Sequence, residues 1–198
     1  MGKHRYSVAT DVAPTASYSA VPDGGEDLPR LHQTHGGGDF AIQRAIAVEA
    51  VEVARAGRVV VLGVQPDAPS SAYGYIRPGE LLATQGRGRR VDRFVEKPKL
   101  EDAERYVANG LLWNCGNFIF RADVMMQELE SYVPDVVTAA STALDKGLRD
   151  LDFLRLNAEA FSLAPKVSID YAVMEKTLAA GVVKASFGWS DVGSWDSI

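Results

Sequence analysis

The sequence has little cysteine, no long apolar run and no clustered positive charge. Its single cysteine, Cys115, excludes a disulfide framework and a cysteine-based zinc site within these 198 residues. No apolar stretch has the length of a membrane span, and the N-terminus lacks the charged-then-apolar pattern of a signal peptide. The formal net charge of -5 argues against a nucleic-acid surface. We therefore expect a soluble, cytoplasmic protein that binds neither nucleic acid nor membranes.

Histidine is also scarce, and its positions bear on the chemistry. His4, His32 and His35 all lie near the N-terminus, so Cys115 has no obvious base to activate it. We interpret Cys115 as a small buried residue rather than a nucleophile. The arginines of the segment 86–90 alternate with glycines, which is typical of a solvated turn.

The composition changes near residue 40. Residues 1–39 are rich in Gly, Pro, Ser, Thr, His and Asp and show no sustained period, which predicts an irregular or disordered segment. Residues 40–198 alternate between helical and strand patterns, which predicts an α/β domain with a parallel or mixed sheet. The expected helices cover 40–56, 100–109, 122–132, 136–144, 152–159 and 169–179, and the expected strands 59–64, 73–76, 91–95, 117–120 and 182–186.

Two segments beside predicted strands carry residues that suit a ligand. Gly74 stands between two aromatic residues, where a glycine permits close backbone approach by a ligand, although this segment by itself favours a bulge or tight bend with aromatic packing. Glu96 and Lys97 directly follow the strand 91–95. At the end of a strand, a carboxylate can accept hydrogen bonds from sugar hydroxyls and an ammonium can hold a phosphate. An exposed ion pair in a turn is the alternative for these two.

Three further segments have the same character. Asn114 has a donor and an acceptor in one amide, which suits vicinal hydroxyls. Asp170 falls in the first turn of a predicted helix, where the helix dipole alone explains an anion and a ligand contact is the alternative. Asp191 lies in the loop 188–195 between two tryptophans, where it suits a hard cation such as Mg²⁺ or an ordinary turn.

The order and spacing of these segments carry a resemblance. The series YGYI, FVEKP, WNCGNFIF, SIDYAVMEK and GWSDVGSW resembles the bacterial mannose-1-phosphate guanylyltransferases, a family of sugar nucleotidyltransferases. The stretch 40–65, which contains VVVLGVQP, is similar to that family as well. The resemblance implies a Rossmann-like nucleotidyltransferase fold with a mixed sheet, of which residues 40–198 are the sugar-phosphate-binding part.

The resemblance also implies an activity and its residues. The family joins mannose 1-phosphate to GTP with Mg²⁺ and releases pyrophosphate, a reaction that depends on positioning and charge stabilisation. It implies that Lys97 and Asp191 are catalytic, with Asp191 on the metal, and that the substrate contacts are Gly74, Tyr75, Glu96, Asn114 and Asp170.

The sequence departs from the family pattern at its N-terminal side. It contains neither the family's Gly-Thr-Arg loop nor its Pro-Ala-Asp-His segment, and Cys115 replaces the usual serine. We therefore expect an N-terminally truncated domain that binds GTP weakly or not at all and has little guanylyltransferase activity. A catalytically inactive fragment that binds a sugar phosphate or a partner is the alternative function. The sequence leaves the oligomeric state open, a homo-oligomer included.

Overall fold

The computed structural model describes residues 6–10, 19–20, 40–83, 86–151, 153–189 and 191. The chain divides into two compact units, each of which is described by itself. The first comprises residues 1–124 and 178–198, and the second residues 125–177. In the described part of the chain, no helix has the length and apolar character that crossing a membrane requires.

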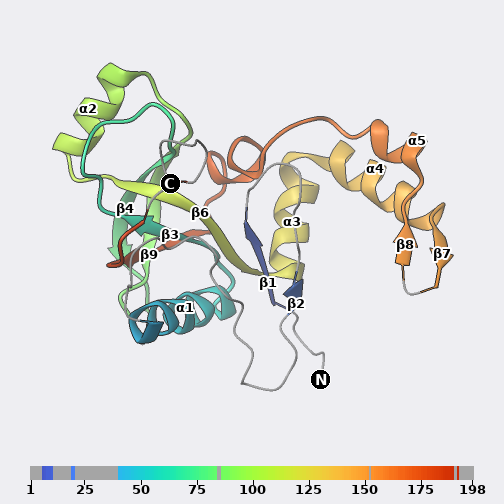
Figure 1. The fold of residues 1–198 in the computed structure, drawn as a ribbon, viewed down its shortest axis with the longest axis horizontal. Helices are drawn as coiled ribbons and strands as arrows, with labels where there is room; N and C mark the ends of the chain where they lie inside the picture. Colours follow the sequence, from blue (N-terminus) through green and yellow to red (C-terminus); the bar gives the residue numbers. More distant parts are fainter. Residues whose placement is uncertain are drawn as a thin grey trace. The chain divides into compact units, whose positions relative to one another are not determined.

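A seven-stranded mixed sheet organises the first unit (Figure 1). Its order is β2-β1-β6-β3-β9-β5-β4, and β4 also pairs with β6. Only the β3–β9 pair is parallel among the described pairings of this sheet. The predicted mixed α/β fold is confirmed. The strands are β1 (Tyr6–Thr10), β2 (Ser19–Ala20), β3 (Val59–Val64), β4 (Tyr75–Leu81), β5 (Arg89–Val95), β6 (Leu112–Arg121) and β9 (Ala180–Ala185).

The core of this unit lies between the sheet and two helices, α1 (Phe40–Arg55) and α2 (Leu100–Ala108). Every residue of β3 is buried, as its uninterrupted apolar sequence predicts for a central strand. Helix α1 supplies Val53 and Ala54, and α2 supplies Ala103 and Tyr106. This packing fixes β3, and with it the ends of the strands that surround the candidate site.

The second unit is mainly helical. It contains most of α3 (Ala122–Tyr132), then α4 (Pro134–Asp145), the hairpin of β7 (Leu148–Asp150) and β8 (Phe153–Arg155), α5 (Ala158–Ser162) and the π-helix η1 (Asp170–Met174). Pro134 starts α4, where its missing N–H costs no hydrogen bond. The side chain of Asn157 caps α5 by accepting from the Ala160 N–H at 2.9 Å.

Several expectations differ from the structure. Residues 152–159, predicted as a helix, contribute to the β7–β8 hairpin, and α5 begins only after the Asn157 cap. The helix predicted over 169–179 is reduced to η1. Within the segment predicted to be irregular, residues 6–10 form β1, because β6 offers them an antiparallel partner that local composition does not reveal. The rest of 1–39, apart from β2, lies outside the described residues.

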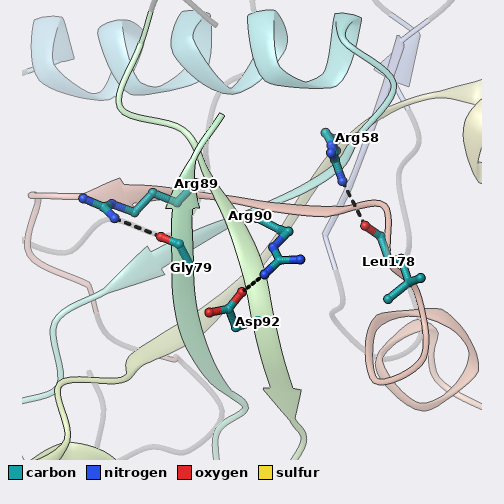
Figure 2. Close-up of polar contacts among 6 residues, drawn as sticks. All are labelled: Arg58, Gly79, Arg89, Arg90, Asp92 and Leu178. Carbon is teal, nitrogen blue, oxygen red and sulfur yellow. Dashed lines mark hydrogen bonds and ion pairs between the residues drawn. The ribbon is translucent and has the colours of Figure 1, made fainter. Parts of the chain in front are cut away.

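Among the arginines beside the glycines, Arg87 lies in an exposed bend, as expected, whereas Arg89 and Arg90 begin strand β5. Figure 2 shows their contacts. Arg89 donates to the carbonyl of Gly79 at 2.9 Å, and Arg90 pairs with Asp92 at 2.7 Å. The contact of Arg89 joins β5 to β4, and the ion pair of Arg90 lies within β5 and offsets part of the positive charge. Arg58 similarly donates to the carbonyl of Leu178 at 2.9 Å.

Candidate functional site

The ends of five strands lie side by side along one edge of the sheet, where the strands start or stop. The register pairs Tyr75 with both Val95 and Trp113, and it pairs Val64 with both Trp113 and Ala185. The first residue of β4 and the start of β6 therefore lie beside the last residues of β3, β5 and β9. Loops that leave such an edge are where α/β sheets bind ligands.

Gly74, Glu96 and Asn114 meet at this edge, and we call these three residues the cradle. The Asn114 N–H donates to the Gly74 carbonyl at 2.8 Å. A Cβ at position 74 would lie 2.6 Å from Glu96 Oε2 and 3.3 Å from the Asn114 Cβ. The carboxylate of Glu96 therefore occupies space that exists only because residue 74 is glycine.

The charges of Glu96 and Lys97 are exposed to different degrees. The Glu96 side chain is 10% exposed, whereas that of Lys97 is 61% exposed. Lys97 Nζ lies 3.4 Å from Glu96 Oε1. The backbone of Lys97 has φ 44°, in the left-handed region, which costs about 1–3 kcal/mol for a residue other than glycine. This turn brings the consecutive charged side chains of Glu96 and Lys97 together.

Asn114 is held by its own neighbours on β6. Its Oδ1 accepts from the Gly116 N–H at 3.1 Å, and Gly116 has φ 76°, a conformation that glycine adopts without strain. Next to it, Asn117 Nδ2 donates to Cys115 Sγ at 3.3 Å. Cys115 is buried, as we expected, and burial raises the pKa of its thiol. The neighbouring residues thus fix the orientation of the Asn114 amide.

Tyr75, expected to contact the substrate, has a different environment from the cradle. Its side chain is fully buried. Its hydroxyl accepts from the Ser70 N–H at 2.9 Å and donates to the Ser70 carbonyl at 3.0 Å. The phenol therefore anchors the loop that precedes Gly74, and the main chain is the part of Tyr75 that lies nearest the cradle.

Three aromatic rings gather behind the cradle, and we call Tyr73, Trp113 and Trp189 the aromatic cluster. The ring centroids are 4.8 Å apart for Tyr73 and Trp113, 5.2 Å for Tyr73 and Trp189, and 6.3 Å for the two indoles. Tyr73 and Trp113 directly precede Gly74 and Asn114. Successive residues of a strand point to opposite faces, so on β6 the Trp113 ring lies on the face away from the Asn114 side chain, and Tyr73 and Trp189 pack on the same core as Trp113.

Sequence reasoning missed the roles of Tyr73, Trp113 and Trp189. The alternation of side chains along paired strands is the signal that separates these rings from the cradle. That signal becomes usable only once the register of β4 with β6 is known.

Asp191 lies in the segment after β9, close enough to Tyr73 to act on its phenol. The pKa of Tyr73 is raised, first by burial and then by the negative charges of Asp191 and Asp67. Among the residues that the structure describes, no three carboxylate, histidine or cysteine side chains form a cluster for a metal. A single carboxylate such as Asp191 suits a Mg²⁺ ion when phosphates and water supply the ion's other ligands.

Asp170 belongs to the second unit and is the first residue of η1. Its side chain is 4% exposed, and π-helical turns are frequent at functional sites. The structure thus brings together Gly74, Glu96, Lys97 and Asn114, and Asp170 stands in a separate compact unit.

Comparisons with known proteins identify the family. The family model described as nucleotidyl transferase matches residues 37–198. The chain is 47% identical over 158 residues to the mannose-1-phosphate guanylyltransferase of Escherichia coli K12, covering 78% of this chain and 33% of that protein. It is 43% identical over 185 residues to the xanthan biosynthesis protein XanB of Xanthomonas campestris, covering 92% of this chain and 39% of that protein.

Solved structures show the same relationship. One from Thermus thermophilus, titled a mannose-1-phosphate geranyltransferase, has a TM-score of 0.67 and 36% identity, covering 80% of this chain and 44% of its own. Another from Helicobacter pylori, titled a mannose-6-phosphate isomerase, has a TM-score of 0.69 and 28% identity, covering 77% and 60%. The chain spans about a third of the length of the curated relatives it matches. It belongs to the nucleotidyl transferase family.

Proposed function

We propose that this chain carries the mannose 1-phosphate-binding part of a guanylyltransferase, which converts GTP and mannose 1-phosphate to GDP-mannose and pyrophosphate. The observation that supports this most is the cradle, in which a glycine leaves room for the Glu96 carboxylate beside Asn114. Relatives that are 46–47% identical bear the name mannose-1-phosphate guanylyltransferase.

Each cradle residue has a part in binding the sugar. Glu96 accepts hydrogen bonds from hydroxyls, Asn114 contributes an amide held by the Gly116 N–H, and the backbone of Gly74 lets the ring approach closely. Burial strengthens the hydrogen bonds to Glu96, whose side chain is 10% exposed. The ammonium of Lys97 offsets the charge of the phosphate.

The reaction that follows is an in-line displacement at phosphorus. An oxygen of the sugar phosphate forms a bond to the α-phosphorus of GTP, and the bond from that phosphorus to the β-phosphate oxygen breaks to release pyrophosphate. Lys97 and the cradle hold the attacking phosphate in position, which is the larger part of such catalysis. Mg²⁺, held in this chain by Asp191 together with phosphates, would neutralise negative charge.

A binding function without catalysis is the second candidate. The observation that favours it is the absence of a Gly-Thr-Arg loop from these 198 residues, since such a loop holds the triphosphate. In either case we place the protein in the cytoplasm, because its one cysteine is free and buried, as is usual in a reducing compartment.

A pyrophosphate-release assay with GTP, mannose 1-phosphate and Mg²⁺ separates the two candidates when it is combined with calorimetric binding of mannose 1-phosphate. Turnover that Glu96→Ala abolishes supports the guanylyltransferase. Binding that Glu96→Ala abolishes, without turnover, supports the second candidate. A chain that neither binds mannose 1-phosphate nor releases pyrophosphate contradicts both.

A further inference from the structure

The aromatic cluster joins three segments that carry the candidate site. Tyr73 precedes the cradle glycine, Trp113 precedes the cradle asparagine, and Trp189 comes two residues before Asp191. Each ring contacts the other two, at centroid distances between 4.8 and 6.3 Å. The segment that follows β9 is thus tied to the loop that ends at Gly74 and to the strand that holds Asn114.

The contacts among these rings come from packing rather than from directed polar bonds. The indole Nε1 atoms of Trp113 and Trp189 are buried, and neither has a hydrogen-bond partner among the described residues. The rings meet edge to face or tilted, with interplanar angles of 56° to 73°, which aromatic pairs favour. Shape and ring contact therefore hold Trp189, so a phenylalanine at this position would lose no hydrogen bond to described residues.

The same segment packs on the core and leads to Asp191. Phe187 and Trp189 both pack against the hydrophobic core of the first unit. Asp191 comes two residues after Trp189 in the sequence. The position of this carboxylate thus depends on a ring two residues earlier in the chain.

We infer that Trp189 is a positioning residue, which fixes the main chain that leads to Asp191 through its ring contacts with Tyr73 and Trp113. The inference rests on the proposed function, in which Asp191 binds a divalent cation together with the sugar phosphate. Trp189 itself packs on the core beside Trp113, so its effect on the ligand is indirect and passes along the chain to Asp191. Removing the ring should release that backbone and leave the cradle as it is.

The test uses Mn²⁺ as a probe, with binding followed by the electron paramagnetic resonance signal of the free ion in the presence of mannose 1-phosphate. Trp189→Ala should weaken Mn²⁺ binding about tenfold, the effect typical of removing a residue that orients a metal ligand. Trp189→Phe should restore most of the affinity. Calorimetric binding of mannose 1-phosphate without metal should change little, because the cradle keeps its contacts.

Two further variants separate positioning from a general loss of structure. Tyr106→Ala removes another aromatic ring of the same core, one that contacts Tyr75 at 5.5 Å and lies on α2. It should destabilise the fold while leaving Mn²⁺ affinity unchanged. In an Asp191→Asn background, Trp189→Ala should have no additional effect on Mn²⁺ binding, since both changes act on one carboxylate.

The inference is overturned if folded Trp189→Ala binds Mn²⁺ as the unaltered chain does, or if Tyr106→Ala weakens binding equally. A full additional loss in the Asp191→Asn background also overturns it. If Asp191→Asn leaves Mn²⁺ binding unchanged, the cation role in the proposed function fails. Amide hydrogen exchange then tests the positioning role separately. The role requires that Trp189→Ala speeds exchange of the amides of 186–191 and that Trp189→Phe does not.

Discussion

Replacement of Gly74 by alanine perturbs the cradle through one added methyl group. The new Cβ would lie 2.6 Å from Glu96 Oε2, 3.3 Å from the Asn114 Cβ and 3.4 Å from Phe94 Cζ. The backbone of Gly74 is not in the left-handed region, so alanine adds a steric conflict and no backbone strain. The nearest atom ends a flexible side chain, so Glu96 moves away and the cost in stability stays near the lower end of about 1–3 kcal/mol.

The effect on the ligand should exceed the effect on stability. A displaced Glu96 gives up a charged hydrogen bond to the sugar, worth about 1.5–3 kcal/mol. Calorimetric titration with mannose 1-phosphate should therefore show roughly ten- to hundredfold weaker binding.

Gly79→Ala is the matched control for this variant. Its Cβ would lie 2.2 Å from Asp92 Oδ1, so it also displaces a carboxylate at the end of a side chain, on the β4–β5 hairpin rather than in the cradle. It should change stability by a similar amount and leave binding unchanged. Gly74→Ala with unchanged affinity, or an equal loss in Gly79→Ala, would refute the role assigned to the cradle.

Three other variants test single features. Tyr75→Phe should lower the free energy of unfolding by about 1 kcal/mol, because the phenol loses its hydrogen bonds with Ser70. The affinity for mannose 1-phosphate should stay unchanged, and weaker binding in a chain of normal stability would contradict a phenol that only anchors the loop. Lys97→Ala should weaken mannose 1-phosphate binding only roughly two- to fivefold, because the ammonium is exposed. The difference from the unaltered chain should shrink at high salt, and a loss that does not depend on salt would refute an electrostatic role for Lys97. Burial raises the pKa of Cys115, so its contribution to stability is present below the unfolded pKa of about 8.5 and is lost as the pH rises through the folded pKa. Denaturant unfolding of Cys115→Ala from pH 7 to 10 should therefore show a shallower decline in stability than the unaltered chain, and an unchanged decline would contradict this.

The sequence predicted the helices and strands that a local apolar pattern is enough to identify. The buried run 59–64 matches β3 at both ends, and the amphipathic stretch from residue 40 matches α1 to within a residue. Strand β6 begins earlier than expected, because Asn114 and Gly116 suggest a loop while pairing with β3 and β4 extends the strand through them. The β7–β8 hairpin turns at Leu151, a leucine with φ 55° that no turn signal marks.

Part of the candidate site could also be predicted from the sequence. Placing Gly74, Glu96 and Asn114 at strand ends required only the order of the elements, and the structure brings these residues together. The aromatic cluster and the burial of the Tyr75 phenol required the register of paired strands, which local patterns do not contain.

The most direct test of the central proposal is calorimetric binding of mannose 1-phosphate to this chain and to its Glu96→Gln variant. Glutamine keeps the size of the side chain and removes the charge, so packing around Gly74 is preserved. The account predicts measurable binding by the unaltered chain and about tenfold or greater weakening in the variant. Equal binding by the two proteins, or no binding by a folded unaltered chain, would contradict it.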